Sequence, residues 1–146
     1  MASAGQLLEA PGLTLSLLET SAETNGELLV MEAGYTGDGP LPPPHFHPSQ
    51  DEHFEVLVGR ARTVIGGVER VYESGESFDV PARTVHQMGG AGACRVRWEV
   101  RPALRTAEFF ERLYGALAAG EFSDEERAAF YAEFAAEFRL AEPGDT

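Results

Sequence analysis

The order of apolar and polar residues divides the chain into a strand-like part and a helical tail. From about residue 12 to residue 101, short apolar runs alternate with turns rich in glycine and proline. This pattern is typical of an antiparallel β-sandwich or barrel. The expected strands cover residues 13–17, 27–33, 54–58, 60–65, 68–72, 77–80 and 93–100. Gly66 and Gly67 separate two of these runs and predict a two-residue hairpin turn, because such turns need positive φ.

After Pro102 the apolar residues recur with a helical period. A first helix is expected over residues 104–119, with Gly120 as its stop signal. A second helix is expected over residues 123–140. Ser123 and Glu126 have the spacing of a capping box, in which each side chain satisfies the other residue's free backbone N–H. The second helix carries Phe130, Phe134 and Phe138 at intervals of four, and Pro143 and Gly144 are its expected end.

The helical tail permits two interpretations. Its aromatic faces either pack on the outside of the barrel or on a dimer partner, or they form a lid over the barrel mouth. Packing is the preferred interpretation, because amphipathic helices normally bury their apolar stripe against a core. The tail is too short to count as a second domain, so residues 1–146 are expected to form a single domain.

The charge balance excludes two classes of partner. With 24 acidic and 11 basic residues, the formal net charge is −13. A strongly negative protein repels phosphate backbones and anionic lipid head groups, so nucleic acid and membranes are not expected as partners. All basic residues are arginines. The absence of lysine excludes a Schiff-base lysine and a P-loop lysine.

Cysteine content and the N-terminal residues predict a cytoplasmic protein. Cys94 is the only cysteine, which excludes an intrachain disulfide and a cysteine-based metal cluster. The first residues lack the basic and apolar regions of a signal peptide, and we find no run of roughly 18 apolar residues that could span a membrane.

Histidine and glutamate residues form the one constellation that indicates chemistry. His45 and His47 are two apart, so in a strand they point to the same side. Prolines on either side of this pair stiffen the backbone that presents it. Glu52 follows after a turn, and His86 lies on a later strand. Three imidazoles and one carboxylate suit a divalent zinc, iron, nickel, copper or manganese ion, and the sequence does not distinguish among these.

The spacing of these residues resembles the first motif of the cupin superfamily, G-x5-H-x-H-x(3,4)-E-x6-G. Gly39, His45, His47, Glu52 and Gly59 meet every fixed position. The resemblance implies that His45, His47 and Glu52 are metal ligands.

The second motif of the family, G-x5-P-x-G-x2-H-x3-N, is met in part. Gly75, Pro81 and His86 match, whereas Arg83 replaces the family's glycine and Gly90 replaces its asparagine. His86 is implied as the fourth metal ligand. Arg83 predicts a different turn, with its guanidinium near the barrel rim.

The resemblance implies a mainly β fold, a single cupin double-stranded β-helix or jelly-roll-like barrel over about residues 12–101 with a C-terminal two-helix extension. It also implies an enzyme that uses one divalent transition metal to act on a small organic molecule. Dioxygenase chemistry is the first expectation, with Glu52 either bound to the metal or acting as a general base. A non-redox isomerase, cyclase, dehydratase or lyase is the alternative, and a non-catalytic small-molecule-binding cupin is another.

Strand alternation predicts the orientation of the remaining candidates. His53 neighbours Glu52 and is therefore expected to point away from the metal, together with Glu55. Met88 should share the inward direction of His86. The other inward residues are expected to be Phe54, Val56, Val58, Cys94, Val96, Trp98 and Val100, and the outward ones Arg95, Arg97 and Glu99. A metal in such surroundings lies in an apolar pocket, which favours an apolar or aromatic substrate, although barrel packing explains the same residues.

A homodimer is expected, because small cupin barrels pair through edge strands. Pairing hides strand edges that otherwise promote aggregation. The segment 7–18 is the candidate for exchange between two subunits.

Overall fold

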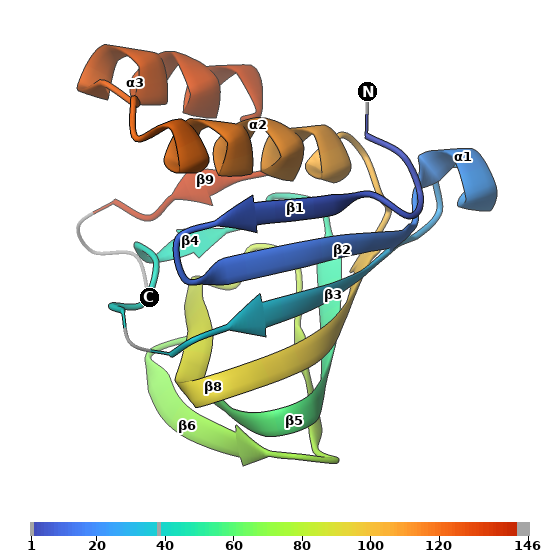
Figure 1. Ribbon diagram of the computed structural model, residues 1–146, viewed down its shortest axis with the longest axis vertical. Coiled ribbons are helices and arrows are strands. Elements are labelled where there is room, and N and C mark those ends of the chain that lie inside the picture. Colours follow the sequence, from blue (N-terminus) through green and yellow to red (C-terminus); the bar gives the residue numbers. More distant parts are fainter. Residues whose placement is uncertain (1, 38, 143–146) are drawn as a thin grey trace.

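The computed structural model describes residues 2–37 and 39–142, and strands dominate its first hundred residues (Figure 1). The strands are β1 (Leu7–Ala10), β2 (Leu13–Glu19), β3 (Leu29–Tyr35), β4 (His45–Phe46), β5 (Asp51–Ile65), β6 (Val68–Glu73), β7 (Ser77–Val80), β8 (His86–Arg101) and β9 (Arg139–Leu140). The helices are α1 (Ser21–Thr24), α2 (Thr106–Ala119) and α3 (Asp124–Glu133). The expectation of a mainly β fold with C-terminal helices is confirmed.

Two long antiparallel strands organise the barrel. β8 pairs with β3 along one edge and with β5 along the other, and it also touches β4 at its start. β5 pairs in addition with β6 and β7, while β1 and β2 extend the sheet beyond β3. The segment 7–18 therefore forms a hairpin on its own chain here, and its exchange with a partner stays a prediction.

Alternation along β8 builds much of the core. Cys94, Val96, Trp98 and Val100 are buried, whereas Arg95 is exposed. Met88 is also buried, as its shared parity with His86 predicts. The same rule holds along β5 for Phe54 and Val56, which pack into the main core cluster.

The prediction that Val58 points inward is wrong, because β5 contains a bulge. The pairing with β8 shifts between Val56 and Val58, so Val56 faces Val96 but Val58 faces Arg95. One extra residue on a strand reverses the direction of the side chains that follow it. Val58 is accordingly 51% exposed.

The turn between β5 and β6 has the predicted form. Gly66 and Gly67 have φ angles of 57° and 82°, and the flanking residues Ile65 and Val68 are paired. Positive φ at both central residues matches the twist of the two strands. The two expected strands before this turn, 54–58 and 60–65, are parts of the single strand β5.

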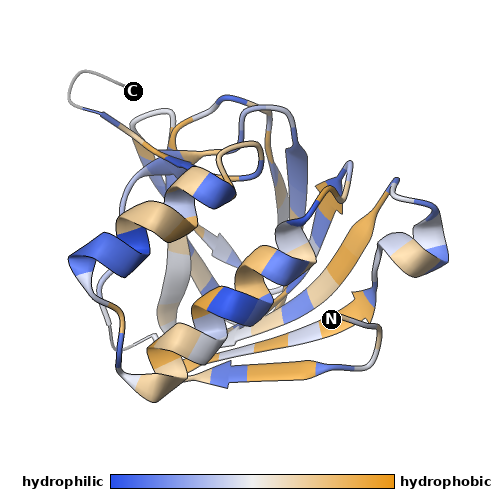
Figure 2. Cartoon of the chain, turned by 90° about the horizontal axis from the view of Figure 1, so that it is seen from above, coloured by the Kyte–Doolittle hydropathy of each residue, from blue (hydrophilic) through white to orange (hydrophobic). Residues whose placement is uncertain are grey.

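The helical tail lies across one end of the barrel, with α2 next to β1 and α3 beyond it (Figures 1 and 2). Gly120 ends α2 in the left-handed conformation, and the capping box of Ser123 and Glu126 begins α3, both as expected. Gln50 fixes the start of α2, because its side-chain amide donates to the carbonyl oxygens of Pro102 and Ala103 and contacts the Thr106 hydroxyl.

The second helix is shorter than the sequence pattern predicts. α3 ends at Glu133 rather than near residue 140, and the chain turns back to form β9 beside β4. Phe134 is buried between the helices, whereas Phe138 leaves the helical stripe and faces the barrel site. Pairing with β4 thus competes successfully with helix continuation. The expected stop at Pro143 and Gly144 lies outside the described residues.

Both departures from the second motif have a structural reading. Arg83 adopts a φ of 67°, a region that non-glycine residues occupy at some cost, and its backbone N–H donates to the carbonyl oxygen of His47. Gly90 is buried where the chain crosses itself closely. A Cβ atom there would lie 2.5 Å from the carbonyl oxygen of Gly92 and 3.2 Å from Cβ of Tyr35, so an asparagine does not fit.

We expect Gly90→Ala to lower the free energy of unfolding by roughly 1–3 kcal/mol, since the backbone at Gly92 must move to admit a methyl group. Gly115→Ala is the matched control, because Gly115 lies on α2 with no atom near the new Cβ. Gly115→Ala should raise the free energy of unfolding by up to about 1 kcal/mol, because alanine has a higher helix propensity than glycine. Urea denaturation of the two variants checks this, and an unaltered Gly90→Ala protein would contradict it.

Candidate metal centre

Three buried imidazoles meet at the end of the barrel that the helices cover. His45 on β4 pairs directly with His86 at the start of β8, and His47 follows β4 by one residue. One nitrogen from each ring lies within 4.8 Å of the others. The fold brings together histidines that are about forty residues apart, because the short strand β4 pairs with the start of β8.

A backbone carbonyl orients each of the three rings. The Nδ1 atoms lie 2.9 Å from the oxygen of Pro43 for His45, 2.7 Å from that of Glu137 for His47 and 2.8 Å from that of Thr84 for His86. A carbonyl only accepts, so each Nδ1 carries the proton and donates. The Nε2 lone pairs are then left for another partner, which is the usual arrangement of metal-binding histidines.

Glu52 on β5 completes the cluster. Its Oε1 lies 3.0 Å from Nε2 of His47 and 3.0 Å from Nε2 of His86, and its Oε2 accepts a hydrogen bond of 2.8 Å from the indole N–H of Trp98. The sequence pattern placed Trp98 in the apolar face of β8 and did not identify it as a partner of the carboxylate.

The contacts within the cluster fit a bound cation better than a closed hydrogen-bond network. Glu52 Oε1 and His47 Nε2 are both buried, and neither has a hydrogen-bond partner of normal geometry among the described atoms. The Nε2 atoms of the histidines and Oε1 of Glu52 lie close together but do not form regular hydrogen bonds with each other. A divalent transition metal bound between them would give each atom a partner, and nitrogen and carboxylate ligands suit such an ion.

The electrostatics of the cluster follow from burial and from mutual contact. Burial lowers the pKa of His45 to about 3, and the neighbouring rings of His86 and His47 add to this effect. Burial raises the pKa of Glu52, but contact with His47 and His86 outweighs it and holds the pKa below its ordinary value. Burial lowers the pKa of His47, and the Glu52 carboxylate reverses this into a net rise. His45 is therefore neutral at pH 7, as a metal ligand must be.

The fourth histidine lies elsewhere. His53 is on the outer face of β5, where its Nδ1 lies 2.7 Å from the Asp79 carboxylate. It takes no part in the cluster, which agrees with the orientation that strand alternation predicts. Glu55 is exposed on the same face.

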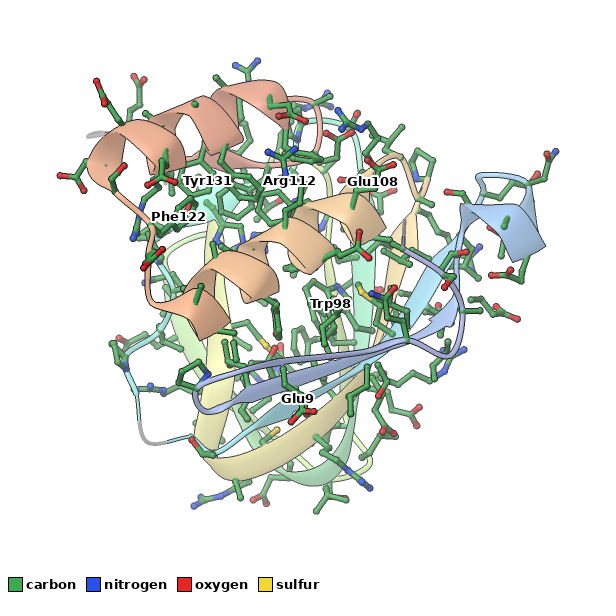
Figure 3. All side chains as sticks on the ribbon, turned by 45° about the horizontal axis from the view of Figure 1, so that its top comes forward. Glu9, Trp98, Glu108, Arg112, Phe122 and Tyr131 are labelled. Carbon is green, nitrogen blue, oxygen red and sulfur yellow. The ribbon has the colours of Figure 1, made fainter. Side chains whose placement is uncertain are left out.

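A cavity of about 430 Å³ adjoins the cluster, between the barrel and the helices. Most of its wall is apolar and aromatic. The barrel contributes Leu13, Phe54, Met88 and Trp98, and the tail contributes Phe109, Phe110, Leu113, Leu117, Phe122, Tyr131 and Phe138. Figure 3 shows Trp98 on the barrel side of α2 and Tyr131 between α2 and α3. The tail thus packs on the barrel and at the same time encloses the site.

The segment 134–141, which we call the strap, touches the cluster directly. Phe138 stacks on the ring of His45 with centroids 4.6 Å apart, and the carbonyl oxygen of Glu137 accepts from His47. The Ala141 N–H donates to Pro44, next to the pairing of β9 with β4. The sequence offered Phe138 only as part of a helical stripe, and no local signal relates it to His45.

The metal-free protein should become less stable as the pH falls below about 6. The pKa of His45 is near 6.5 in an unfolded chain and about 3 in the fold, so between these values the unfolded chain binds more protons. The stability that neutral His45 provides is thus present above pH 6.5 and lost on the way to pH 3. Between pH 6 and pH 4, unfolding free energies in the presence of EDTA should fall more steeply than those of His45→Gln, by up to about 1.4 kcal/mol per pH unit. His47 occurs in both proteins, so its opposite contribution largely cancels, and parallel curves would contradict the assignment.

Comparison with solved structures shows the same fold in several proteins. KdgF from Halomonas sp. is 19% identical with a TM-score of 0.58, covering 66% of this chain and 87% of its own. An RmlC-like cupin from Shewanella frigidimarina is 21% identical with a TM-score of 0.61, covering 70% and 87%. Pac13 from Streptomyces, described as a nucleoside dehydratase, has 12–13% identity and a TM-score of 0.56, covering 71% and 82%. At these identities the likeness concerns the fold alone.

Comparison with sequences gives the family. No curated protein sequence matches the chain closely enough to count as a relative. In residues 2–37 and 39–142, no helix combines the length and the apolar character that crossing a bilayer requires. The model of the cupin domain matches residues 25–100, just over half of the chain, and this stretch holds all four residues of the buried cluster. The chain therefore belongs to the cupin domain family.

Proposed function

We propose that this cupin is a metal-dependent enzyme acting on a small, largely apolar organic molecule. One observation carries the proposal: a buried set of three imidazoles and a carboxylate opens onto a largely aromatic cavity. His45, His47, His86 and Glu52 would hold the metal. Their number leaves positions free on an ion that accepts five or six ligands, and the cavity supplies space for a substrate beside them.

The chemistry that a bound ion supplies depends on the metal. Iron, manganese, nickel or copper would supply dioxygen activation or polarisation of a substrate oxygen, whereas zinc would supply polarisation and activation of water without dioxygen chemistry. The protein contributes nitrogen donors, one carboxylate held by Trp98, and largely apolar walls. Apolar surroundings lower the local dielectric constant and so strengthen electrostatic interactions beside the cluster.

Dioxygenase chemistry is the first candidate, because the cavity is poor in groups that transfer protons. Among the described residues that line it, Glu52 is the only carboxylate, and the only imidazoles belong to the cluster. Burial raises the pKa of Tyr35, Tyr114 and Tyr131, so these phenols stay protonated at neutral pH. An isomerase, dehydratase or lyase needs a positioned acid or base. Oxygen chemistry at a metal does not have the same need.

A non-redox reaction is the second candidate, and it depends on Glu52. If the carboxylate leaves the metal, it can act as a base, since no other carboxylate lines the cavity among the described residues, and the Trp98 N–H holds its second oxygen in place. Pac13, which shares the fold, is described as a dehydratase. A cupin that binds its ligand without turnover is the remaining outcome of the tests below.

We expect the purified protein to carry about one iron, manganese, nickel or copper ion per chain. His47→Ala should lose most of it, since the ligand that the Glu137 carbonyl orients is gone. His53→Ala is the matched control and should keep its metal, because His53 lies on the outer face. Elemental analysis checks both variants.

The same samples decide between the reaction classes. With catechol or acetylacetone as probe substrate, an oxygen electrode should record uptake by the wild-type protein and by His53→Ala, and not by His47→Ala. Zinc in the native protein, together with no oxygen uptake after iron reconstitution, would contradict a dioxygenase and support the non-redox reaction. A protein that binds no metal better than His47→Ala does would be a binding module.

The strap should contribute to metal affinity. Phe138→Ala removes the ring that stacks on His45 and loosens the segment whose carbonyl holds His47, so the dissociation constant for zinc should rise about tenfold or more. Phe122 lines the same cavity without touching the cluster, so Phe122→Ala should change the dissociation constant for zinc less than threefold. Zinc competition with a chromophoric chelator measures both, and equal effects would contradict a specific role of the strap.

A further inference from the structure

Three tyrosines line the cavity, Tyr35, Tyr114 and Tyr131, and none of them has a hydrogen-bond partner among the described residues. Two of them pack on the main core cluster, one from the barrel and one from the tail. Tyr35 is the last residue of β3 and is partly buried, and Tyr114 lies on α2 and is 6% exposed. Their hydroxyl groups neither donate to nor accept from any described residue, unlike the Trp98 N–H nearby.

The two phenols belong to one polar spot in the cavity. Burial raises the pKa of Tyr35, and the neighbouring Tyr114 phenol and Glu52 carboxylate contribute to the rise. Burial raises the pKa of Tyr114 to about 12. Both are therefore neutral donors at pH 7. The two phenols line the same cavity as the histidine cluster, so one small molecule in the cavity can contact the phenols and the cluster.

A hydroxyl group that faces a cavity without a protein partner pairs with water or with a ligand, because leaving it unpaired costs free energy. Arg62 and Arg127 also line the cavity, but neither bonds to these phenols. Much of the remaining wall is aromatic. Phe54 stacks on Trp98 with centroids 5.2 Å apart, and Phe110 meets Trp98 edge-on at 5.1 Å. Ring faces of this kind hold a flat apolar molecule, but they do not satisfy a phenol.

We propose that Tyr35 and Tyr114 together bind an oxygen atom of the substrate. The substrate class is then a flat, mostly apolar molecule, an aromatic compound of one or two rings, that carries a hydroxyl or carbonyl oxygen for the two phenols. This inference deepens the proposed function, and it rests on the substrate occupying the same cavity. The pair acts as a specificity determinant, because a cavity built to pair an oxygen rejects the analogue that lacks it.

The test compares two probes of the same shape, 2-naphthol and 2-methylnaphthalene, on the full chain loaded with zinc, which does not activate dioxygen. Equilibrium dialysis with ultraviolet detection gives the two dissociation constants. The wild-type protein should prefer 2-naphthol about tenfold or more. Tyr35→Phe and Tyr114→Phe should each reduce the preference to about threefold or less, while the affinity for 2-methylnaphthalene is kept or slightly improved.

Tyr131→Phe is the matched control, because Tyr131 lines the same cavity with an equally unpaired hydroxyl but lies away from the pair. Its ring stacks on Phe138, and its charged neighbour is Arg127 rather than Glu52 or another tyrosine. It should keep the full preference for 2-naphthol. Thermal melts of all variants show whether each is folded. A wild-type protein that binds both probes equally or neither, or Phe variants that keep the preference, would overturn the proposal.

Zinc content measured in the same samples separates this proposal from the proposed function. If the protein holds about one zinc ion per chain but shows no preference for 2-naphthol, the proposed metal centre stands and the proposed role of the tyrosine pair is contradicted. A protein that retains no zinc loses the metal centre, and a hydroxyl preference that Tyr35→Phe and Tyr114→Phe abolish would still support the tyrosine pair.

Discussion

The orientation of three imidazoles by three backbone carbonyls is the constraint on which the site depends. Each carbonyl fixes the proton on Nδ1 and leaves the Nε2 lone pair facing the cluster. Two of these carbonyls, those of Pro43 and Thr84, belong to residues two positions before the histidine they orient. The proline run before β4 and the turn before β8 therefore determine the rings as well as the backbone. Glu52 then enters from β5 as the one anion, with Trp98 as its support.

The third carbonyl, that of Glu137, connects the site to the tail. The strap delivers this oxygen and the ring of Phe138 to the cluster, and β9 fixes the strap to β4. Arg105 and Arg112 both contact Glu133 and so join α2 to α3 just before the strap begins. The packing of α2 and α3 consequently also fixes the orientation of His47. The expected packing of the tail on the barrel is present, and the packed helices also line the cavity.

The features that the sequence predicted depend on neighbours along the chain, whereas the features that it missed depend on contacts between distant residues. Strand alternation placed Trp98 and Met88 inward and His53 outward, because these depend on neighbours along one strand. The motif spacing brought His45, His47, Glu52 and His86 forward as one set. Alternation failed at Val58, where a bulge that depends on the partner strand reverses the parity. The predicted end of α3 was wrong for a related reason, since pairing of β9 with β4 overrides the helical period of Phe138. The contact of Glu137 with His47 spans ninety residues, and no local pattern contains it.

The division of the chain between shared and individual parts also bears on function. The residues matched by the cupin domain, 25–100, contain all four members of the cluster, whereas α2, α3 and the strap lie beyond them. Much of the cavity wall, with Phe109, Phe110 and Tyr114, comes from that outer part. The four candidate metal ligands therefore belong to the part of the chain that the family shares, whereas much of the cavity wall beside them comes from outside it. For this reason the substrates of other cupins carry little weight here, and the aromatic lining with its two phenols is the better guide to the molecule that binds.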